Sequence, residues 1–219
     1  MNMAIITGTR SGIGRALARA LEADGWSVHG LNRPTFDLNN LHDHLDRLNG
    51  VLSLVRDGGF DRKVFIMNAA EMHVGPAMDA TAAERIIRVN LTAHMKIAGL
   101  FMHACLKDKT KCEIALVSSM AARMPSRYWA FYAASKAGLE AYLRCIETEG
   151  YPVHLLVPIA VDTQMQTKLR ETDWPEAAFY KNLQETGRLK SPEEVVSGWI
   201  GRLNNPAVPR APRDVKTSA

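Results

Sequence analysis

Residues 3–14, Met-Ala-Ile-Ile-Thr-Gly-Thr-Arg-Ser-Gly-Ile-Gly, decide the fold. A short apolar run, 3–7, leads into Gly8, Gly12 and Gly14, after which apolar residues return at helical spacing. A strand that turns through glycines into a helix lets the backbone approach a phosphate and points the N–H groups of the helix start toward it. The alternative is a tight strand-to-helix turn without a ligand, because the G-x-x-x-G-x-G spacing differs from the commoner G-x-G-x-x-G pattern.

Strands and helices alternate along the rest of the chain. Apolar runs predict strands over 27–31, 64–67, 114–117 and 153–157, and helical spacing predicts helices over 40–57, 81–106 and 132–148. Two capping boxes, Thr81 to Glu84 and Ser191 to Glu194, predict helix starts, the second with proline at its first helical position. This alternation predicts one doubly wound, Rossmann-type α/β domain with a parallel sheet over 1–205, followed by a basic, proline-rich tail over 206–219.

The link after the second strand is too short for the usual connection. Only a few residues separate Arg33 from Asp37, whereas a parallel crossover needs a dozen or more. We therefore expect a sheet without the helix and outer strand that would follow 27–31, with 35–38 passing over the adenine side of a cofactor as a loop. Asp37 either accepts a hydrogen bond from the adenine amino group or simply opens the next helix.

Positive charge at the end of the second strand favours NADP(H) over NAD(H). That position faces the adenosine ribose, where a carboxylate favours NAD and an arginine accommodates the additional phosphate of NADP. This chain has Asn32 followed by Arg33, and Arg10 in the glycine loop provides a second cation. The alternative makes Arg33 a solvated turn residue and Arg10 a surface cation.

Four side chains predict proton chemistry. Tyr132 and Lys136 lie four residues apart, on one face of a predicted helix. The pKa of a tyrosine lies near 10, and a neighbouring ammonium lowers it toward neutrality. Ser119, at the end of a predicted strand, can bond a substrate oxygen, and Asn90, a poor helix former inside a long helix, can hold a water that links Lys136 to solvent. The set predicts proton transfer at an alcohol or carbonyl oxygen, with the hydride coming from the cofactor.

Together these motifs resemble the short-chain dehydrogenase/reductase family, over about residues 3–165. The resemblance rests on Thr7-Gly8-x-x-x-Gly12-Ile13-Gly14, Asn68-Ala69-Ala70, Asn90, Ser119 and Tyr132-x-x-x-Lys136. It implies that Asn90, Ser119, Tyr132 and Lys136 form a catalytic tetrad, that Asn68 supports the central sheet, and that 161–163 meet the nicotinamide. The cofactor contacts inferred in all are Gly8, Thr9, Arg10, Ser11, Gly12, Ile13, Gly14, Asn32, Arg33, Asp37, Asn68, Ala69, Ala70, Tyr132, Lys136, Val161 and Thr163.

Two shorter stretches, 161–166 and 183–192, resemble the sepiapterin reductase and benzil reductase branch of the family. This resemblance implies NADPH-dependent reduction of a vicinal dicarbonyl or a similar ketone. Several side chains are candidates for an apolar pocket wall, or for a lid within the 163–189 insertion, and equally for plain core: Met124, Tyr128, Trp129, Met165, Trp174, Phe179 and Tyr180.

The chain departs from the family pattern at two positions. Glu71 follows Asn68-Ala69-Ala70 where the family usually has glycine after Asn-Ala, and Ile159 follows Pro158 where glycine is usual. Two other functions remain open: an NAD-dependent alcohol dehydrogenase, and a nucleotide-binding regulatory or scaffold protein on the same fold without turnover.

Composition excludes several other classes of protein. Residues 201–219 carry a net charge of +3 out of the total of +4, so no basic stripe for nucleic acid is expected in the body of the chain. No apolar run is long enough to span a bilayer, and the first residues do not resemble a signal peptide, so we expect a cytoplasmic protein. Three cysteines without a CxxC pair, and scattered histidines, predict neither a disulfide framework nor a metal site. We expect a small-molecule carbonyl or alcohol substrate and self-association as a homodimer or homotetramer.

Overall fold

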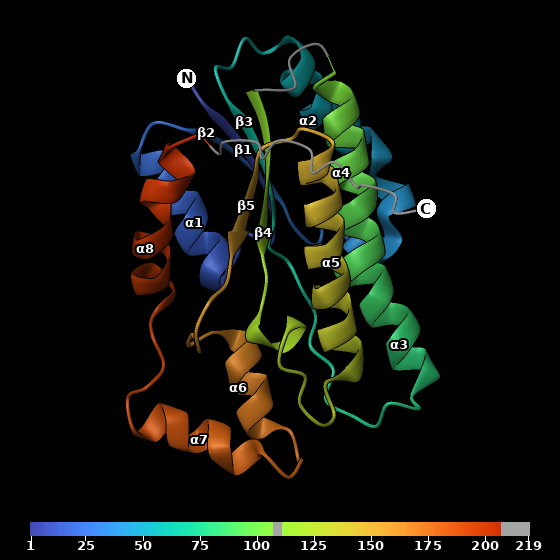
Figure 1. Cartoon of the computed structure of the whole chain (residues 1–219), viewed down its shortest axis with the longest axis vertical. Helices are drawn as coiled ribbons and strands as arrows, with labels where there is room; N and C mark the ends of the chain where they lie inside the picture. The colour runs from blue at the N-terminus through green and yellow to red at the C-terminus, as the bar shows by residue number, and fades with distance from the viewer. Residues whose placement is uncertain (107–110, 207–219) are drawn as a thin grey trace, which may run out of the picture.

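A five-stranded parallel sheet forms the centre of the part of the chain that the computed structural model describes, residues 1–106 and 111–206 (Figure 1). Its strands are β1 (Met3–Thr7), β2 (Ser27–Leu31), β3 (Lys63–Met67), β4 (Cys112–Val117) and β5 (Val153–Leu156). They lie in the order β2-β1-β3-β4-β5, and every neighbouring pair is parallel. The order reverses between β1 and β3, and this switch point is where such sheets bind ligands, beyond the carboxyl ends of the strands. The predicted doubly wound α/β fold is confirmed.

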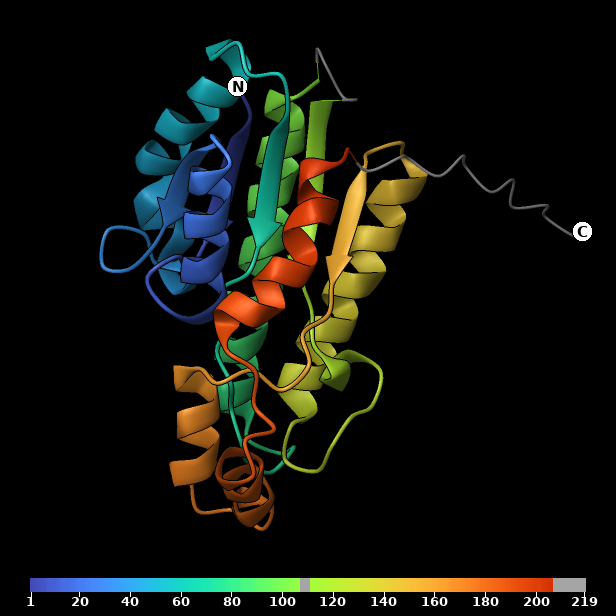
Figure 2. The same cartoon turned by 90° about the vertical axis from the view of Figure 1, so that its left-hand side faces the viewer.

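Helices cover both faces of the sheet. Two helices, α1 (Gly12–Ala23) and α8 (Pro192–Asn204), lie side by side on one face, and α2 (Leu45–Asp57), α4 (Ala93–Ala104) and α5 (Ala130–Thr148) lie on the other (Figures 1 and 2). Alternate residues of β1 enter the two separate cores, Ala4 and Ile6 with α1 and α8, Met3 and Ile5 with the opposite layer. This period of two is why a strand buried on both faces is apolar throughout.

The short link after β2 leaves this strand at the edge of the sheet, as expected. In the described residues β2 is an edge strand, and residues 32–37 form a turn and loop that enters the 3₁₀ helix η1 (Leu38–His44). The side chain of Asp37 accepts a hydrogen bond from the backbone N–H of Asn39 at 2.9 Å. Asp37 therefore opens the next helix, the second of the two roles considered for it.

The long helix predicted over 81–106 is interrupted, and its predicted start is wrong. Asp79 is the N-cap of α3 (Ala80–Ile87), since its carboxylate accepts from the N–H of Ala82 at 3.0 Å. A carboxylate satisfies the free N–H groups of a helix start at least as well as the predicted Thr81 does. After α3 the backbone widens into a π-helical turn, η2 (Arg88–Thr92), before α4 begins. The second capping box, from Ser191 to Glu194, is confirmed.

The cysteines also differ from the prediction. Cys105, just after α4, and Cys112, at the start of β4, form a disulfide, whereas Cys145 is free and exposed. Their Cα atoms are 6.1 Å apart, within the range that a disulfide spans. The number and spacing of the cysteines gave no sign of this pair, because the fold decides which cysteines meet in space.

The connection after β5 extends beyond the sheet. It contains α6 (Gln164–Glu171) and α7 (Ala177–Glu185), which lie past the carboxyl ends of the strands (Figures 1 and 2). The 3₁₀ helix η4 (Met120–Ala122) follows β4 at the same end. In the described ranges, no helix combines the length and apolar character needed to cross a membrane. Residues 207–219 of the predicted tail lie outside the described residues.

Close packing at Gly14 gives a first test of the structure. A Cβ at Gly14 would lie 2.0 Å from the carbonyl oxygen of Gly8 and 2.4 Å from Nδ2 of Asn68. We expect Gly14→Ala to lower the free energy of unfolding by about 1–3 kcal/mol in urea titration, because the added methyl overpacks the loop. The matched control is Gly50→Ala in α2, where a Cβ would meet no atom within 4 Å. This control should raise stability by about 0.5–1 kcal/mol, and equal effects of the two variants would contradict the packing described.

Candidate active site

The glycine loop after β1 is held from both neighbouring strands. On the β2 side, Oδ1 of Asn32 accepts from the N–H of Thr9 at 2.6 Å, and Nδ2 of Asn32 donates to Oγ1 of Thr9 at 2.8 Å. On the β3 side, Nδ2 of Asn68 donates to the carbonyl oxygens of Thr7 and Gly8, at 2.8 and 3.1 Å. Gly8 and Gly12 have positive φ, +78° and +53°, a conformation that side chains disfavour. The loop thus has a fixed shape and a bare backbone at the switch point.

Two arginines stand at the end of β2, as predicted. Nη1 of Arg10 donates to the carbonyl oxygen of Arg33 at 2.8 Å. The guanidinium of Arg33 is 67% exposed and lies 3.9 Å from Oε1 of Glu71. The side chain of Arg33 therefore remains largely open to solvent, and to any anion that approaches the end of β2.

Ser119, Tyr132 and Lys136 come together at the carboxyl end of β4. Tyr132 and Lys136 are buried on α5, and the Ser119 side chain forms a hydrogen bond with Tyr132. Nζ of Lys136 lies 5.9 Å from the centre of the Tyr132 ring and donates to the carbonyl oxygen of Val117 at 2.9 Å. Three members of the predicted tetrad therefore lie together, with Ser119 and Lys136 beside the phenol of Tyr132.

The pKa of Tyr132 differs in direction from the prediction. Burial raises the pKa of this phenol, and the hydrogen bond from Ser119 opposes the rise only in part. We expected Lys136 to lower it, but removal from water disfavours the phenolate more strongly in this structure. Burial also lowers the pKa of Lys136, to about 8. Tyr132 is consequently a protonated acid at neutral pH.

Asn90 has a structural contact that the sequence did not reveal. It lies fully buried in the π-helical turn, and its Oδ1 accepts from the N–H of Glu71 at 2.8 Å. Its Nδ2 donates to the carbonyl oxygen of Glu71 at 2.8 Å and to Oγ of Ser135 at 3.2 Å. Both amide hydrogens are used by protein groups, so this side chain holds the loop after β3 in place, and its expected role in holding a water stays a prediction.

A buried histidine, which sequence reasoning missed, links this region to the glycine loop. Nδ1 of His94 lies 3.1 Å from the carbonyl oxygen of Asn90, and Nε2 lies 3.0 Å from Oγ1 of Thr7. A carbonyl only accepts, so Nδ1 carries the proton and Nε2 accepts from Thr7. Burial, with the Lys136 charge second, lowers the pKa of His94 to about 4. The spacing of four residues from Asn90 was the one available signal.

Glu71 directly follows Ala70, which stands where the family pattern usually has glycine after Asn-Ala. Its carboxylate receives both Nε and Nη2 of Arg85, at 2.7 and 2.9 Å, and it also lies near Arg33. Such a two-point pair fixes the carboxylate in one orientation. Through Arg85, Glu71 therefore links α3 to Arg33 at the end of β2.

Aromatic side chains cover the Tyr132 end of α5. Trp129 contacts Trp174 and Tyr180, with ring centres 6.1 and 5.8 Å apart, and it meets the Tyr132 ring edge-on at 6.1 Å. Trp174 and Tyr180 belong to the segment that contains α6 and α7, so this segment packs against Trp129, which in turn contacts Tyr132. Tyr128 and Met165 pack against the same cluster, but Met124 and Phe179 are 66% and 55% exposed.

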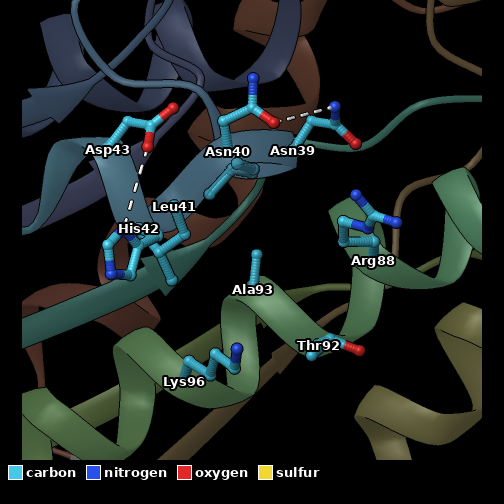
Figure 3. A pocket seen from close by; sticks show the side chains of 10 residues that line it. Asn39, Asn40, Leu41, His42, Asp43, Arg88, Thr92, Ala93 and Lys96 are labelled. Carbon is cyan, nitrogen blue, oxygen red and sulfur yellow. Dashed lines mark hydrogen bonds and ion pairs between the residues drawn. The ribbon is translucent and has the colours of Figure 1, made fainter.

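A separate surface hollow lies away from these residues. Figure 3 shows it between η1 and the start of α4, with Asn40 and His42 on one side and Arg88 and Lys96 on the other. Its volume is about 250 Å³, and no tetrad residue lines it, so we assign it no part in the chemistry. Across the described ranges, no three metal-ligating side chains gather in a cluster able to hold an ion.

The chain belongs to the short-chain dehydrogenase/reductase family, whose model, described as short chain dehydrogenase, matches residues 58–174. A relative from Bacillus subtilis, a benzil reductase that forms (S)-benzoin, is 30% identical over 93% of each chain. The crystal structure of the KRED1-Pglu enzyme superposes with a TM-score of 0.78 at 21% identity, covering 96% of this chain and 97% of the other. A Beutenbergia cavernae protein, assigned as an NAD(P)-dependent gluconate 5-dehydrogenase and holding NADP at low occupancy, gives a TM-score of 0.72 at 25% identity, over 94% and 89% of the chains.

The depressed pKa of His94 predicts a defined loss of stability in acid. The folded state holds this ring neutral down to about pH 4, whereas the unfolded chain protonates it near 6.5. Its contribution is therefore complete above pH 6.5 and is lost as the pH falls toward 4, by about 3 kcal/mol. We expect the free energy of unfolding of the wild type to approach that of His94→Gln over this window in urea titrations.

The matched control is His103→Gln, the same substitution at an exposed position on α4. This control should follow the wild type at each pH. A constant gap between the wild type and His94→Gln from pH 7 to 4 would contradict the neutral, buried ring.

Proposed function

We propose that the protein reduces a ketone or vicinal dicarbonyl with NADP(H), and that Tyr132 donates the proton. The observation that carries the proposal is the buried Tyr132 phenol, hydrogen-bonded to Ser119 and flanked by Lys136. Its membership of an oxidoreductase family and its similarity to a benzil reductase support this chemistry and this substrate class.

The cofactor, when bound, supplies a hydride to the carbonyl carbon. Tyr132 then delivers its proton to the carbonyl oxygen, so that the product is an alcohol. Burial keeps the phenol protonated at neutral pH, which suits an acid that works in the direction of reduction. The Ser119 hydroxyl, which donates to Tyr132 in the structure, has one hydrogen and would turn to donate it to the carbonyl oxygen, so that this oxygen is held beside Tyr132.

Lys136 acts on the phenol through charge. Its ammonium is tied to the carbonyl oxygen of Val117, which fixes it beneath the Tyr132 ring. As the proton leaves, negative charge develops on the phenol oxygen, and a nearby cation stabilises that charge in a site with little water. The position of Lys136 therefore favours the charged state that Tyr132 reaches only during the reaction.

The residues at the switch point fit a dinucleotide. The bare backbone of 8–14 would hold the pyrophosphate at the start of α1, and Val161 and Thr163 would meet the nicotinamide. Asn32 stands where a carboxylate would favour NAD, and Arg33 with Arg10 offers positive charge for the 2′-phosphate of NADP. The bound NADP of the Beutenbergia cavernae protein supports a cofactor of this class.

Exposed Met95 and Leu100 on α4 support self-association of this chain as a homodimer or homotetramer.

Replacement of the acid tests the assigned chemistry. Tyr132→Phe removes only the phenol oxygen, so we expect kcat to fall by about 10²–10⁴-fold while NADPH binding, followed by fluorescence, persists. Tyr142→Phe is the matched control on the same helix, because its hydroxyl bonds only weakly to the carbonyl oxygen of Met95, at 3.5 Å. Turnover by Tyr132→Phe comparable to that of the control would overturn the assignment. Cofactor binding by the wild type without turnover of any carbonyl would instead favour a scaffold.

Replacement of Arg33 tests the cofactor preference. A charged hydrogen bond to the 2′-phosphate is worth about 1.5–3 kcal/mol, so Arg33→Ala should weaken NADPH binding by about ten- to a hundredfold and leave NADH nearly unchanged. The matched control is Arg56→Ala, at an exposed position on α2 away from the glycine loop. Equal losses for NADPH and NADH would be incompatible with a phosphate contact and would favour an NAD-dependent enzyme.

A further inference from the structure

One buried hydrogen-bond donor beside Tyr132 has no partner. Among the described residues, three buried side-chain atoms lack a hydrogen bond: Nε2 of His73, Oε1 of Gln166 and Nε1 of Trp129. Nε2 of His73 lies 3.5 Å from a carboxylate oxygen of Asp79, and Oε1 of Gln166 is an acceptor. Only Trp129 leaves an obligate donor unsatisfied, because an indole N–H cannot accept.

The position of this donor is set by α5. Trp129 is the residue before the helix, and Tyr132 lies one turn further on. Their rings meet edge to face with centres 6.1 Å apart, and Ala121, two residues after Ser119, packs in the same cluster. The indole is only 9% exposed. Trp129 therefore lies beside the two residues proposed to bind the substrate oxygen.

An unpaired buried donor has an energetic cost of about 1–3 kcal/mol, so natural structures seldom retain one without a role. The other tryptophan of the cluster shows the usual arrangement, because Nε1 of Trp174 donates to the carbonyl oxygen of Leu169 at 2.8 Å. Trp129 and Trp174 face the same aromatic neighbour, Tyr180, and differ in this one bond. Nε1 of Trp129 is thus a donor without a partner beside Tyr132.

We propose that Nε1 of Trp129 donates a hydrogen bond to the second carbonyl oxygen of a vicinal dicarbonyl substrate. This inference rests on the proposed function and deepens it. Tyr132 and Ser119 bind the oxygen of the carbonyl that is reduced, and a simple ketone has no other. A vicinal dicarbonyl has a second oxygen on the adjacent carbon, and a site with two groups of donors close together recognises both. Trp129 then selects dicarbonyls over simple ketones and fixes which carbonyl faces Tyr132.

A pair of substrates of equal size tests this selection. Benzil and deoxybenzoin share two phenyl rings and differ in the second carbonyl. Trp129→Phe removes the N–H and keeps an aromatic ring, so we expect its kcat/KM for benzil to fall by about ten- to a hundredfold more than for deoxybenzoin. Trp174→Phe is the matched control, since it loses a tryptophan of the same cluster whose N–H is already bonded. It should change both substrates by the same factor.

Binding measurements keep the test independent of turnover. Calorimetric titration of the same two compounds into the protein loaded with NADP⁺ should show the same selective loss in Trp129→Phe. Equal losses for benzil and deoxybenzoin, or the same selectivity change in Trp174→Phe, would overturn the role of Trp129. A wild type that reduces deoxybenzoin as well as benzil would refute the selection yet leave the proposed reductase standing. A wild type that turns over neither compound, but binds benzil through Trp129, would refute the proposed reduction alone.

Discussion

The hydroxyl of Thr7 is the contact on which the arrangement of the site depends. At the end of β1, its Oγ1 accepts from the N–H groups of Asn68 and Ala69, both at 3.0 Å, and it bonds Nε2 of His94 at 3.0 Å. One side chain therefore joins the glycine loop, the segment after β3 and the helix that carries Asn90. All three segments end at the switch point, where backbone groups outside the ladder need partners of their own.

The same network determines where the reacting groups lie. The ring of His94 hydrogen-bonds both Thr7 and the carbonyl oxygen of Asn90. The side chain of Asn90 in turn hydrogen-bonds both the N–H and the carbonyl oxygen of Glu71. The π-helical turn brings Asn90 into this position, and such widened turns often occur at functional sites. In the same turn, Nδ2 of Asn90 reaches Ser135, the neighbour of Lys136 on α5. The glycine loop and the part of α5 that carries Tyr132 are consequently joined in one hydrogen-bonded frame.

Much of this frame could be predicted from the sequence, because strands buried on both faces leave uninterrupted apolar runs and the glycine loop has a distinct spacing. The short link from Arg33 to Asp37 also sufficed to predict β2 as the edge strand. The rest depends on contacts distant in sequence. The π-helical turn, the His94 ring and the unpaired Trp129 are defined by their neighbours in space, and the disulfide joins cysteines whose spacing alone shows nothing. For the same reason the pKa of Tyr132 was predicted with the wrong sign, since its burial could not be known.

The burial of Tyr132 and the charge of Lys136 together suit this site to the proposed reduction. Trp174 and Tyr180, from the segment that contains α6 and α7, pack on Trp129, which in turn contacts Tyr132, and burial raises the pKa of the Tyr132 phenol. Loss of water also strengthens the field of the Lys136 ammonium. In the proposed reduction the ground state would thereby be a neutral acid, while the phenolate that forms during proton transfer would be stabilised by a cation already in place. The aromatic rings beside Tyr132 would then serve both the chemistry and the recognition of an aryl substrate, because the rings that help to bury the phenol are the ones such a substrate would contact.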